Sequence, residues 1–188
     1  MSMKERNHYA GIGSRETPAQ TLVAMQQAAA QLETMDFVLN SGGATGADQA
    51  FEYGVKDPAN KQIFLPWDGF NGRSMTDPGC ELTHNWAICD QATDLAQKFH
   101  PNWAALSREA KSMMWRNAFQ VLGEDLKTPV RFIMCWTEGG KIKGGTGQAL
   151  RMAAAYKIPV FNLGSMSLAE AAAGVNEIAE QIREENAA

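Results

Sequence analysis

The chain has 188 residues, of which 45% are hydrophobic and 20% are charged, and its formal net charge is −4. These values are typical of one globular domain with a buried core, and the negative charge argues against broad attraction to nucleic acid or an anionic membrane. No apolar run reaches the roughly 20 residues that cross a bilayer, and residues 1–6 are charged rather than signal-like. Three cysteines, Cys80, Cys89 and Cys135, leave one thiol over, which favours a reducing cytoplasm without a disulfide framework.

The first expected strand, residues 8–12, runs into the glycine turn Gly11-Ile12-Gly13-Ser14-Arg15. A helix is expected to begin at Thr17 as its N-cap, with Pro18 in the first helical position and Gln20 closing a capping box. Apolar residues then recur at helical spacing, so this helix buries one face.

A second glycine turn lies in the middle of the stretch 37–48. The apolar run 37–39 ends in Ser41-Gly42-Gly43-Ala44-Thr45-Gly46-Ala47-Asp48, and a helical pattern follows. Glycine lets a ligand approach the backbone, and the free N–H groups at a helix start favour phosphate. The alternative is a tight strand-to-helix turn without a ligand.

The middle of the chain combines a strand, a long loop and two helices. A third strand is expected at 62–65, and the glycine-, proline- and polar-rich stretch 67–79 reads as a long loop. Helical patterns follow at about 85–99 and 107–122. We interpret residues 67–128 as a loop and helical insertion in the domain.

The last third of the chain returns to alternating strands and helices. Residues 130–136 form a continuously apolar strand that ends at a third glycine cluster, Gly144-Gly145-Thr146-Gly147. A helix is expected at 148–156 and a strand at 158–163. Ser167-x-x-Glu170 is a capping box for a final helix.

Alternating strands and helices predict an α/β fold, a single domain with a parallel sheet and helices on both faces. Ligands in such sheets bind beyond the carboxyl ends of the strands. Because all three glycine clusters follow apolar runs, we expect them to converge on one site.

Two common nucleotide motifs are incomplete in this chain. Glu16 occupies the third glycine position of G-x-G-x-x-G, and Gly145 stands where a Walker A loop has its lysine. An ordinary ATPase or kinase, and ordinary NAD-dependent hydride transfer, therefore lose their main support.

Four motifs instead resemble the SLOG superfamily, which includes the DNA-processing protein DprA, the LOG phosphoribohydrolases and the YspA-like proteins. They are Tyr9-Ala10-Gly11-Ile12-Gly13-Ser14-Arg15, Ser41-Gly42-Gly43-Ala44-x-Gly46-Ala47-Asp48, Leu65-Pro66-Trp67-x-Gly69-Phe70-Asn71-Gly72 and Gly144-Gly145-Thr146-Gly147. The chain is most similar to the YspA-like branch and its phage-encoded relatives. The resemblance implies a Rossmann-like sheet, a nucleotide-derived ligand and a homodimer or larger homo-oligomer.

The resemblance also implies a set of ligand-binding residues. Asp48 either caps N–H groups or accepts from a ribose hydroxyl, and the aromatic rings of Trp67 and Phe70 either stack on a base or anchor their loop. Arg116 and Asn117 are either ligand contacts or an exposed polar pair. The expected set is Gly11, Gly13, Ser14, Arg15, Ser41, Gly42, Gly43, Ala44, Gly46, Asp48, Trp67, Phe70, Arg116, Asn117, Thr137, Glu138, Gly144, Gly145, Thr146 and Gly147.

One departure from the LOG pattern bears on catalysis. LOG hydrolases carry G-G-x-G-T-x-x-E, and this chain has Arg151 at the position of the glutamate, on a helix that we expect to direct it away from the ligand. Glu138 and Glu52 are possible substitutes, and Glu138 and Asp48 are the candidate catalytic residues.

Three functions follow as hypotheses. The first is binding of an ADP-ribose- or NAD-related compound or a signalling nucleotide, as a sensor or sequestering protein. The second is nucleotide N-glycosidase chemistry, which needs a carboxylate near the anomeric carbon. The third, DprA-like binding of single-stranded DNA, is disfavoured by the charge. We expect no cofactor and no membrane partner, and the irregular spacing of Cys80, His84 and Cys89 argues against a zinc site.

Overall fold

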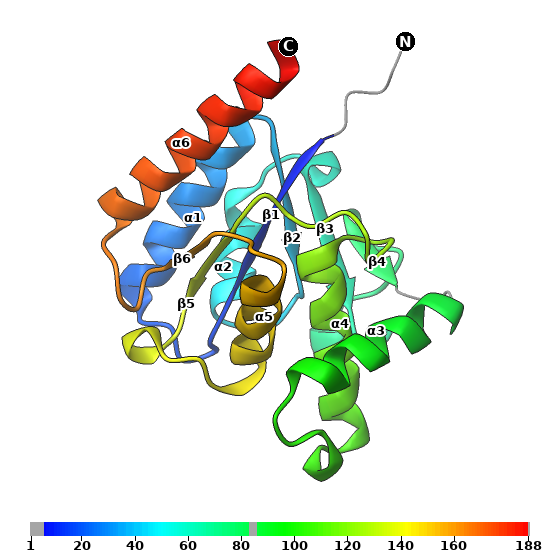
Figure 1. Cartoon of the computed structure of the whole chain (residues 1–188). Helices are drawn as coiled ribbons and strands as arrows, with labels where there is room; N and C mark the ends of the chain where they lie inside the picture. Colours follow the sequence, from blue (N-terminus) through cyan, green and yellow to red (C-terminus); the bar gives the residue numbers. More distant parts are fainter. Residues whose placement is uncertain (1–5, 83–85, 188) are drawn as a thin grey trace.

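A parallel sheet forms the centre of the protein, in a computed structural model that describes residues 6–82 and 86–187 (Figure 1). The six strands in these ranges are β1 Asn7–Gly13, β2 Phe37–Ser41, β3 Lys61–Leu65, β4 Cys80–Leu82, β5 Ile133–Trp136 and β6 Val160–Asn162. Their order in the sheet is β4-β3-β2-β1-β5-β6, and each neighbouring pair is parallel. The chain builds outward from β1 in both directions, so the topological switch point lies between β1 and β5.

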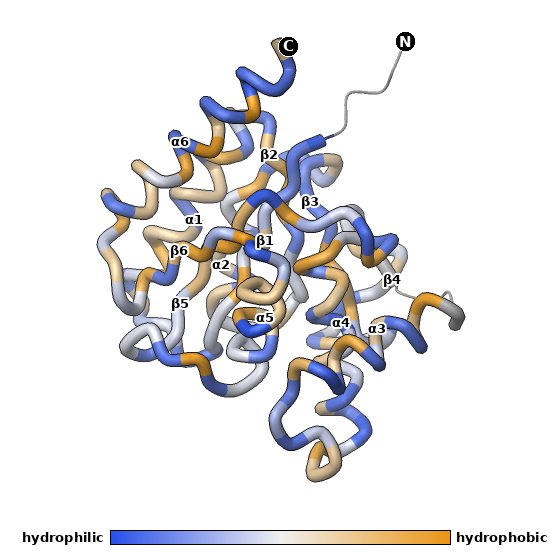
Figure 2. Tube along the Cα trace, viewed as in Figure 1, coloured by the Kyte–Doolittle hydropathy of each residue, from blue (hydrophilic) through white to orange (hydrophobic). Residues whose placement is uncertain are grey.

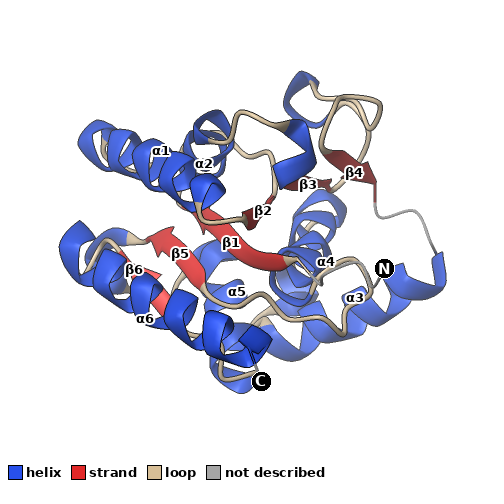
Figure 3. Cartoon of the chain, turned by 90° about the horizontal axis from the view of Figure 1, so that it is seen from above, coloured by secondary structure: helices blue, strands red, loops and turns tan. Residues whose placement is uncertain are grey.

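Six α-helices in the described ranges connect and cover these strands. They are α1 Ala19–Thr34, α2 Ala47–Gly54, α3 Trp86–Phe99, α4 Arg108–Leu122, α5 Gly144–Ala155 and α6 Leu168–Ala187. Figure 3 shows the strands between α1 and α2 on one side and α3, α4 and α5 on the other. The α/β, Rossmann-like fold in one domain that the sequence predicts is therefore confirmed.

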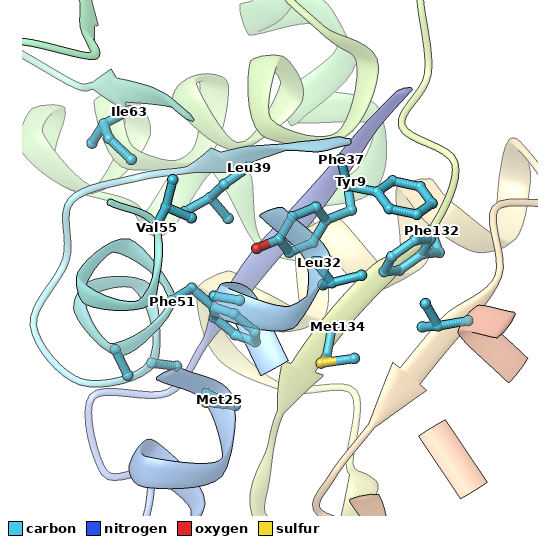
Figure 4. Close-up of a cluster of buried hydrophobic side chains, with 14 of the residues drawn as sticks. Tyr9, Met25, Leu32, Phe37, Leu39, Phe51, Val55, Ile63, Phe132 and Met134 are labelled. Carbon is cyan, nitrogen blue, oxygen red and sulfur yellow. The ribbon is translucent and has the colours of Figure 1, made fainter. Parts of the chain in front are cut away.

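Two hydrophobic clusters occupy the two faces of the sheet. On the first, Tyr9 and Met134 of the sheet pack with residues of α1, α2 and α6, and Figure 4 shows the Tyr9 ring among Phe37, Phe51 and Phe132. The second cluster joins the opposite face to α3, α4 and α5. Figure 2 shows hydrophobic residues along the central strands and hydrophilic ones on the outward parts of the helices. None of the helices in the described ranges has the length and apolarity that a bilayer crossing requires.

The prediction of helices at 85–99 and 107–122 is confirmed by α3 and α4. The capping box at the start of α6 is also confirmed, because the Ser167 backbone N–H and hydroxyl donate to Glu170 Oε2 at 2.8 and 2.7 Å. Strand β4 was not expected. It is a three-residue strand at the edge of the sheet, too short to show a periodic pattern.

The prediction of a capping box at Thr17 is wrong. Helix α1 begins at Ala19 with Pro18 as its N-cap, and no side chain caps it. The Thr17 hydroxyl instead donates to the Ser14 carbonyl at 2.7 Å. This bond is local to the first glycine turn, so the threonine shapes the loop rather than the helix.

The prediction that a helix starts at residue 148 is also wrong. Helix α5 starts at Gly144, so the third glycine cluster forms its first turn, and the first helical bond runs from the Gly147 N–H to the Lys143 carbonyl at 2.9 Å. The glycines do not follow β5 directly either, because residues 137–143 lie between them. Low helix propensity argued for a loop here, and the tertiary structure overrides it.

Candidate functional site

A pocket of about 400 Å³ lies where the chain leaves the carboxyl ends of β1 and β5, at the switch point of the sheet. Its volume is within the range of small-molecule sites. In Figure 1 these strand ends are at the lower edge of the sheet. The pocket is lined by Ile12, Gly13, Ser14, Arg15, Glu16, Ala44, Asp48, Met113, Met114, Arg116, Asn117, Gln120, Thr137, Glu138, Lys143, Gly144, Gly145, Thr146 and Ala149.

The first turn of α5 forms one wall of this pocket. Lys143 is its N-cap residue, no side chain accepts from the turn as a cap, and the turn contains no acidic residue. Within the part of the chain that the structure describes, the N–H groups of Gly144, Gly145 and Thr146 therefore have neither an intrahelical acceptor nor a capping side chain. Gly144 has φ of 64°, a conformation that favours glycine. This wall is a positive helix end without its own anion.

The N-terminus of α2 has the opposite character, because Asp48 lies in its first turn. The Asp48 side chain is buried beside the backbone N–H groups of Ala44, Gly13 and Gly42. Burial raises the pKa of Asp48, while nearby Arg116 and these N–H groups act to lower it. The carboxylate thus holds the turns after β1 and β2 together, which favours the capping alternative for Asp48.

Arg116 of α4 reaches Asp48 across the fold. Its Nη1 lies 3.5 Å from Asp48 Oδ2, and its guanidinium carbon lies 5.9 Å from the centre of the Phe70 ring. Gly42 makes room for it, because a Cβ at Gly42 would lie 1.0 Å from Nη1. Burial lowers the pKa of Arg116, and the Asp48 charge raises it. Arg116 is therefore a buried, paired cation rather than an exposed polar residue.

The mouth of the pocket carries charges of both signs. Glu138 Oε2 accepts from Lys143 Nζ at 2.9 Å, and both side chains are exposed. Lys143 lowers the pKa of Glu138, so this carboxylate is ionised at neutral pH. Arg15 is exposed and its Nη2 donates to Met113 Sδ at 3.7 Å.

Twelve of the residues expected from the sequence line this one pocket. They come from all three glycine clusters, from α4 and from the segment that follows β5: Gly13, Ser14, Arg15, Ala44, Asp48, Arg116, Asn117, Thr137, Glu138, Gly144, Gly145 and Thr146. Asn117 also ties α4 to α5, because its Nδ2 donates to the Gly145 carbonyl at 3.2 Å and to Gln148 Oε1 at 3.0 Å. Thr137 is buried, and its hydroxyl accepts from Asn162 at 2.7 Å.

The other expected glycines and Ser41 do not line the pocket, and the contacts of three of them lie in the core or between the neighbouring turns. A Cβ at Gly11 would meet Phe51 in the core, and one at Gly46 would meet the backbone of Ser14 and Arg15. The Ser41 hydroxyl donates to the Gly11 carbonyl at 2.7 Å. The residues in this group that are absent from the lining are Gly11, Ser41, Gly42, Gly43, Gly46 and Gly147.

Trp67 and Phe70 lie outside the pocket lining. Their rings pack edge to face against each other, with 5.1 Å between the ring centroids. Phe70 is buried, and the neighbouring Asn71 donates to the Gly43 carbonyl at 2.9 Å. These contacts favour the loop-anchoring alternative. Base stacking on these rings is not supported by this geometry.

Two charged residues weighed for catalysis lie away from the pocket. Glu52 is buried against Arg73, with an Oε1 to Nη2 distance of 2.7 Å, and does not line the site. Arg151 is directed away as expected, because its Nε donates to the Phe99 carbonyl at 2.7 Å.

Sequence analysis missed several lining residues, chiefly Met113, Met114, Gln120 and Lys143. Met113 and Gln120 lie three and four positions from Arg116 on α4, and Met114 lies three positions from Asn117, a helical spacing that could have found them. No group of three or more metal-ligating side chains occurs in the described ranges, and His84 of the weighed zinc motif lies outside them.

Comparison of the chain with protein-family models, with curated proteins and with solved structures gave no match. The function must therefore be argued from the chemistry of the pocket.

Proposed function

We propose that this protein binds a nucleotide-derived small molecule, with a phosphate of the ligand at the first turn of α5. The observation that carries the proposal is the uncapped N–H groups of Gly144, Gly145 and Thr146, in the wall of a pocket at the switch point. Arg15, on the same pocket, adds a positive charge. A helix N-terminus and an arginine together are a common anion site.

The remaining pocket wall supports a nucleoside rather than a bare phosphate. Ile12, Met113, Met114 and Ala149 give it apolar surface beside the polar end. Methionine adapts to flat ring systems and makes favourable sulfur–aromatic contacts. The resemblance to the SLOG superfamily points to the same class of ligand, which includes ADP-ribose- and NAD-related compounds, and we propose membership of that group.

The state of Asp48 and Glu138, the two carboxylates that the sequence offers for catalysis, favours a sensor or sequestering protein over a hydrolase. Asp48 is buried beside three backbone N–H groups and pairs with Arg116. Glu138 is paired with Lys143 at the exposed mouth, and its lowered pKa keeps it from acting as a general acid at neutral pH. The third acid of the lining, Glu16, is exposed.

Titration calorimetry with AMP, NAD and ADP-ribose tests this proposal. We expect at least one of them to bind, and Arg15→Ala to weaken that binding about tenfold, because a charge-assisted contact to phosphate is lost. Arg108→Ala is the control, since Arg108 is an exposed arginine outside the pocket lining. Absence of binding by all three compounds, or equal affinities of the Arg15 and Arg108 variants, would refute the site.

The same mixtures, separated by chromatography after long incubation, distinguish binding from turnover. The nucleotides should be recovered intact. Rapid release of free base by the wild type, lost in Glu138→Gln, would instead support the glycosidase.

A further inference from the structure

Among the described residues, the pocket has two buried side chains in its lining that carry an unpaired hydrogen-bond donor. Arg116 and Gln120 line it from successive turns of α4, and they are 4% and 2% exposed. Within the described ranges, neither Arg116 Nε nor Gln120 Nε2 has a hydrogen-bond partner. Buried polar groups are nearly always paired in folded proteins, so these two donors are unusual.

The Arg116 guanidinium and the Gln120 amide both lie against Gly42. A Cβ built on this glycine would be 1.0 Å from Arg116 Nη1, the atom that faces Asp48, and 2.7 Å from Gln120 Nε2. Both side chains therefore use the space that a larger residue at position 42 would fill. Because the guanidinium and the amide share this place, one acceptor group of a ligand can contact both side chains.

The protein itself supplies little acceptor capacity at this place. Asp48 is the carboxylate paired with Arg116, through a single long contact of 3.5 Å to Nη1. The backbone N–H groups of Gly13, Gly42 and Ala44 also act on this carboxylate and favour its charged form. The Gln120 backbone carbonyl is engaged as well, because it accepts from Asn40 Nδ2 at 3.4 Å.

We propose that Arg116 and Gln120 form a second anion subsite, which receives a further phosphate or a carboxylate of the ligand whose first phosphate lies at α5. This inference rests on the proposed function and narrows its ligand class to nucleotides with a second anionic group. Arginine binds such groups through two parallel bonds, and the terminal torsion of glutamine is broad, so the Gln120 amide can turn toward the ligand.

The test compares AMP with two nucleotides that carry a second anionic group, ADP and adenylosuccinate, by titration calorimetry. We expect ADP or adenylosuccinate to bind the wild type about tenfold more tightly than AMP, because charge-assisted bonds are added. Preference for ADP identifies the second group as phosphate, and preference for adenylosuccinate identifies it as carboxylate.

Gln120→Leu is the decisive variant. It should reduce the preference for the second anionic group to about threefold or less while leaving AMP affinity nearly unchanged. Its melting temperature without ligand should not fall, because the side chain amide nitrogen that it removes has no partner. Gln97→Leu makes the same change at an exposed position of α3 and should keep the full preference.

The outcomes distinguish failure of the anion subsite from failure of the proposed function. If AMP binds but neither second anion improves affinity, or if Gln120→Leu keeps the wild-type preference, the subsite is refuted and the proposed function stands. If none of the three nucleotides binds, the subsite is refuted, and the titrations with NAD and ADP-ribose decide whether the proposed function stands.

Discussion

Helices α2 and α5 both begin in glycine-rich turns, yet their N-termini are in different electrostatic states. In α2 the first turn carries Asp48, a buried carboxylate beside backbone N–H groups of the turns after β1 and β2. In α5 the first turn has no acid and no capping side chain. A glycine turn before a helix therefore does not by itself identify a phosphate site, because the chain can supply the anion itself.

This difference changes where we place the ligand phosphate. The sequence analysis associated phosphate binding with the glycine turn in the stretch 37–48, at the start of α2. A phosphate there would lie close to the Asp48 carboxylate, and Gly42 and Gly43 do not line the pocket. The open end of α5 has no such anion in its first turn, so it is the better acceptor of the ligand charge.

The largest expected effect is that of removing the α2 anion. Asp48→Asn should lower the free energy of unfolding by about 3 kcal/mol, because it leaves Arg116 buried without a counter-charge. Urea denaturation at neutral pH measures this change. Glu16→Gln, which neutralises an exposed acid of the same pocket, is the control, and an equally small loss in both variants would contradict the structural role of Asp48.

A smaller contrast is expected between glycines of the two turns. Gly42→Ala should destabilise the protein by about 2 kcal/mol, because the new Cβ displaces the Arg116 guanidinium. Gly145→Ala should leave stability equal or higher by up to about 1 kcal/mol, since alanine is the better helix former. The new Cβ would be 3.1 Å from the flexible end of Met114.

Gly145→Ala should bind AMP more weakly than the wild type although its stability is equal or higher. The reason is that the alanine adds a methyl group to the pocket wall. Thermal denaturation with and without AMP measures both properties. Equal stability of the two alanine variants would show that the turns do not differ in the way described.

The smallest effect is expected at the mouth of the pocket. Glu138→Gln should not change stability measurably, because the Glu138–Lys143 pair is exposed. It should raise AMP affinity about two- to threefold at low ionic strength, since a negative charge near the phosphate is removed, and the gain should shrink as salt is added. Affinity that falls at every salt concentration would indicate that Glu138 contacts the ligand directly.

Local patterns in the sequence were sufficient for much of the fold. Hydrophobic periodicity gave the positions of α3 and α4, and the Ser167–Glu170 capping box marked the start of α6. These signals involve residues three or four positions apart, where the backbone geometry is fixed by the helix itself. The same kind of reasoning failed at Thr17, whose hydroxyl has a competing acceptor in the preceding turn.

The sequence by itself determined the α/β class and brought the three glycine clusters to one edge of the sheet, because parallel strands share the direction of their carboxyl ends. Only the tertiary structure decided which cluster is open to a ligand. That outcome depends on the Asp48–Arg116 pair, formed across 68 residues, and on α4 covering the switch point with Gln120 and the two methionines. Charge pairing between distant elements depends on how the layers pack, and the spacing of residues along the chain does not predict it.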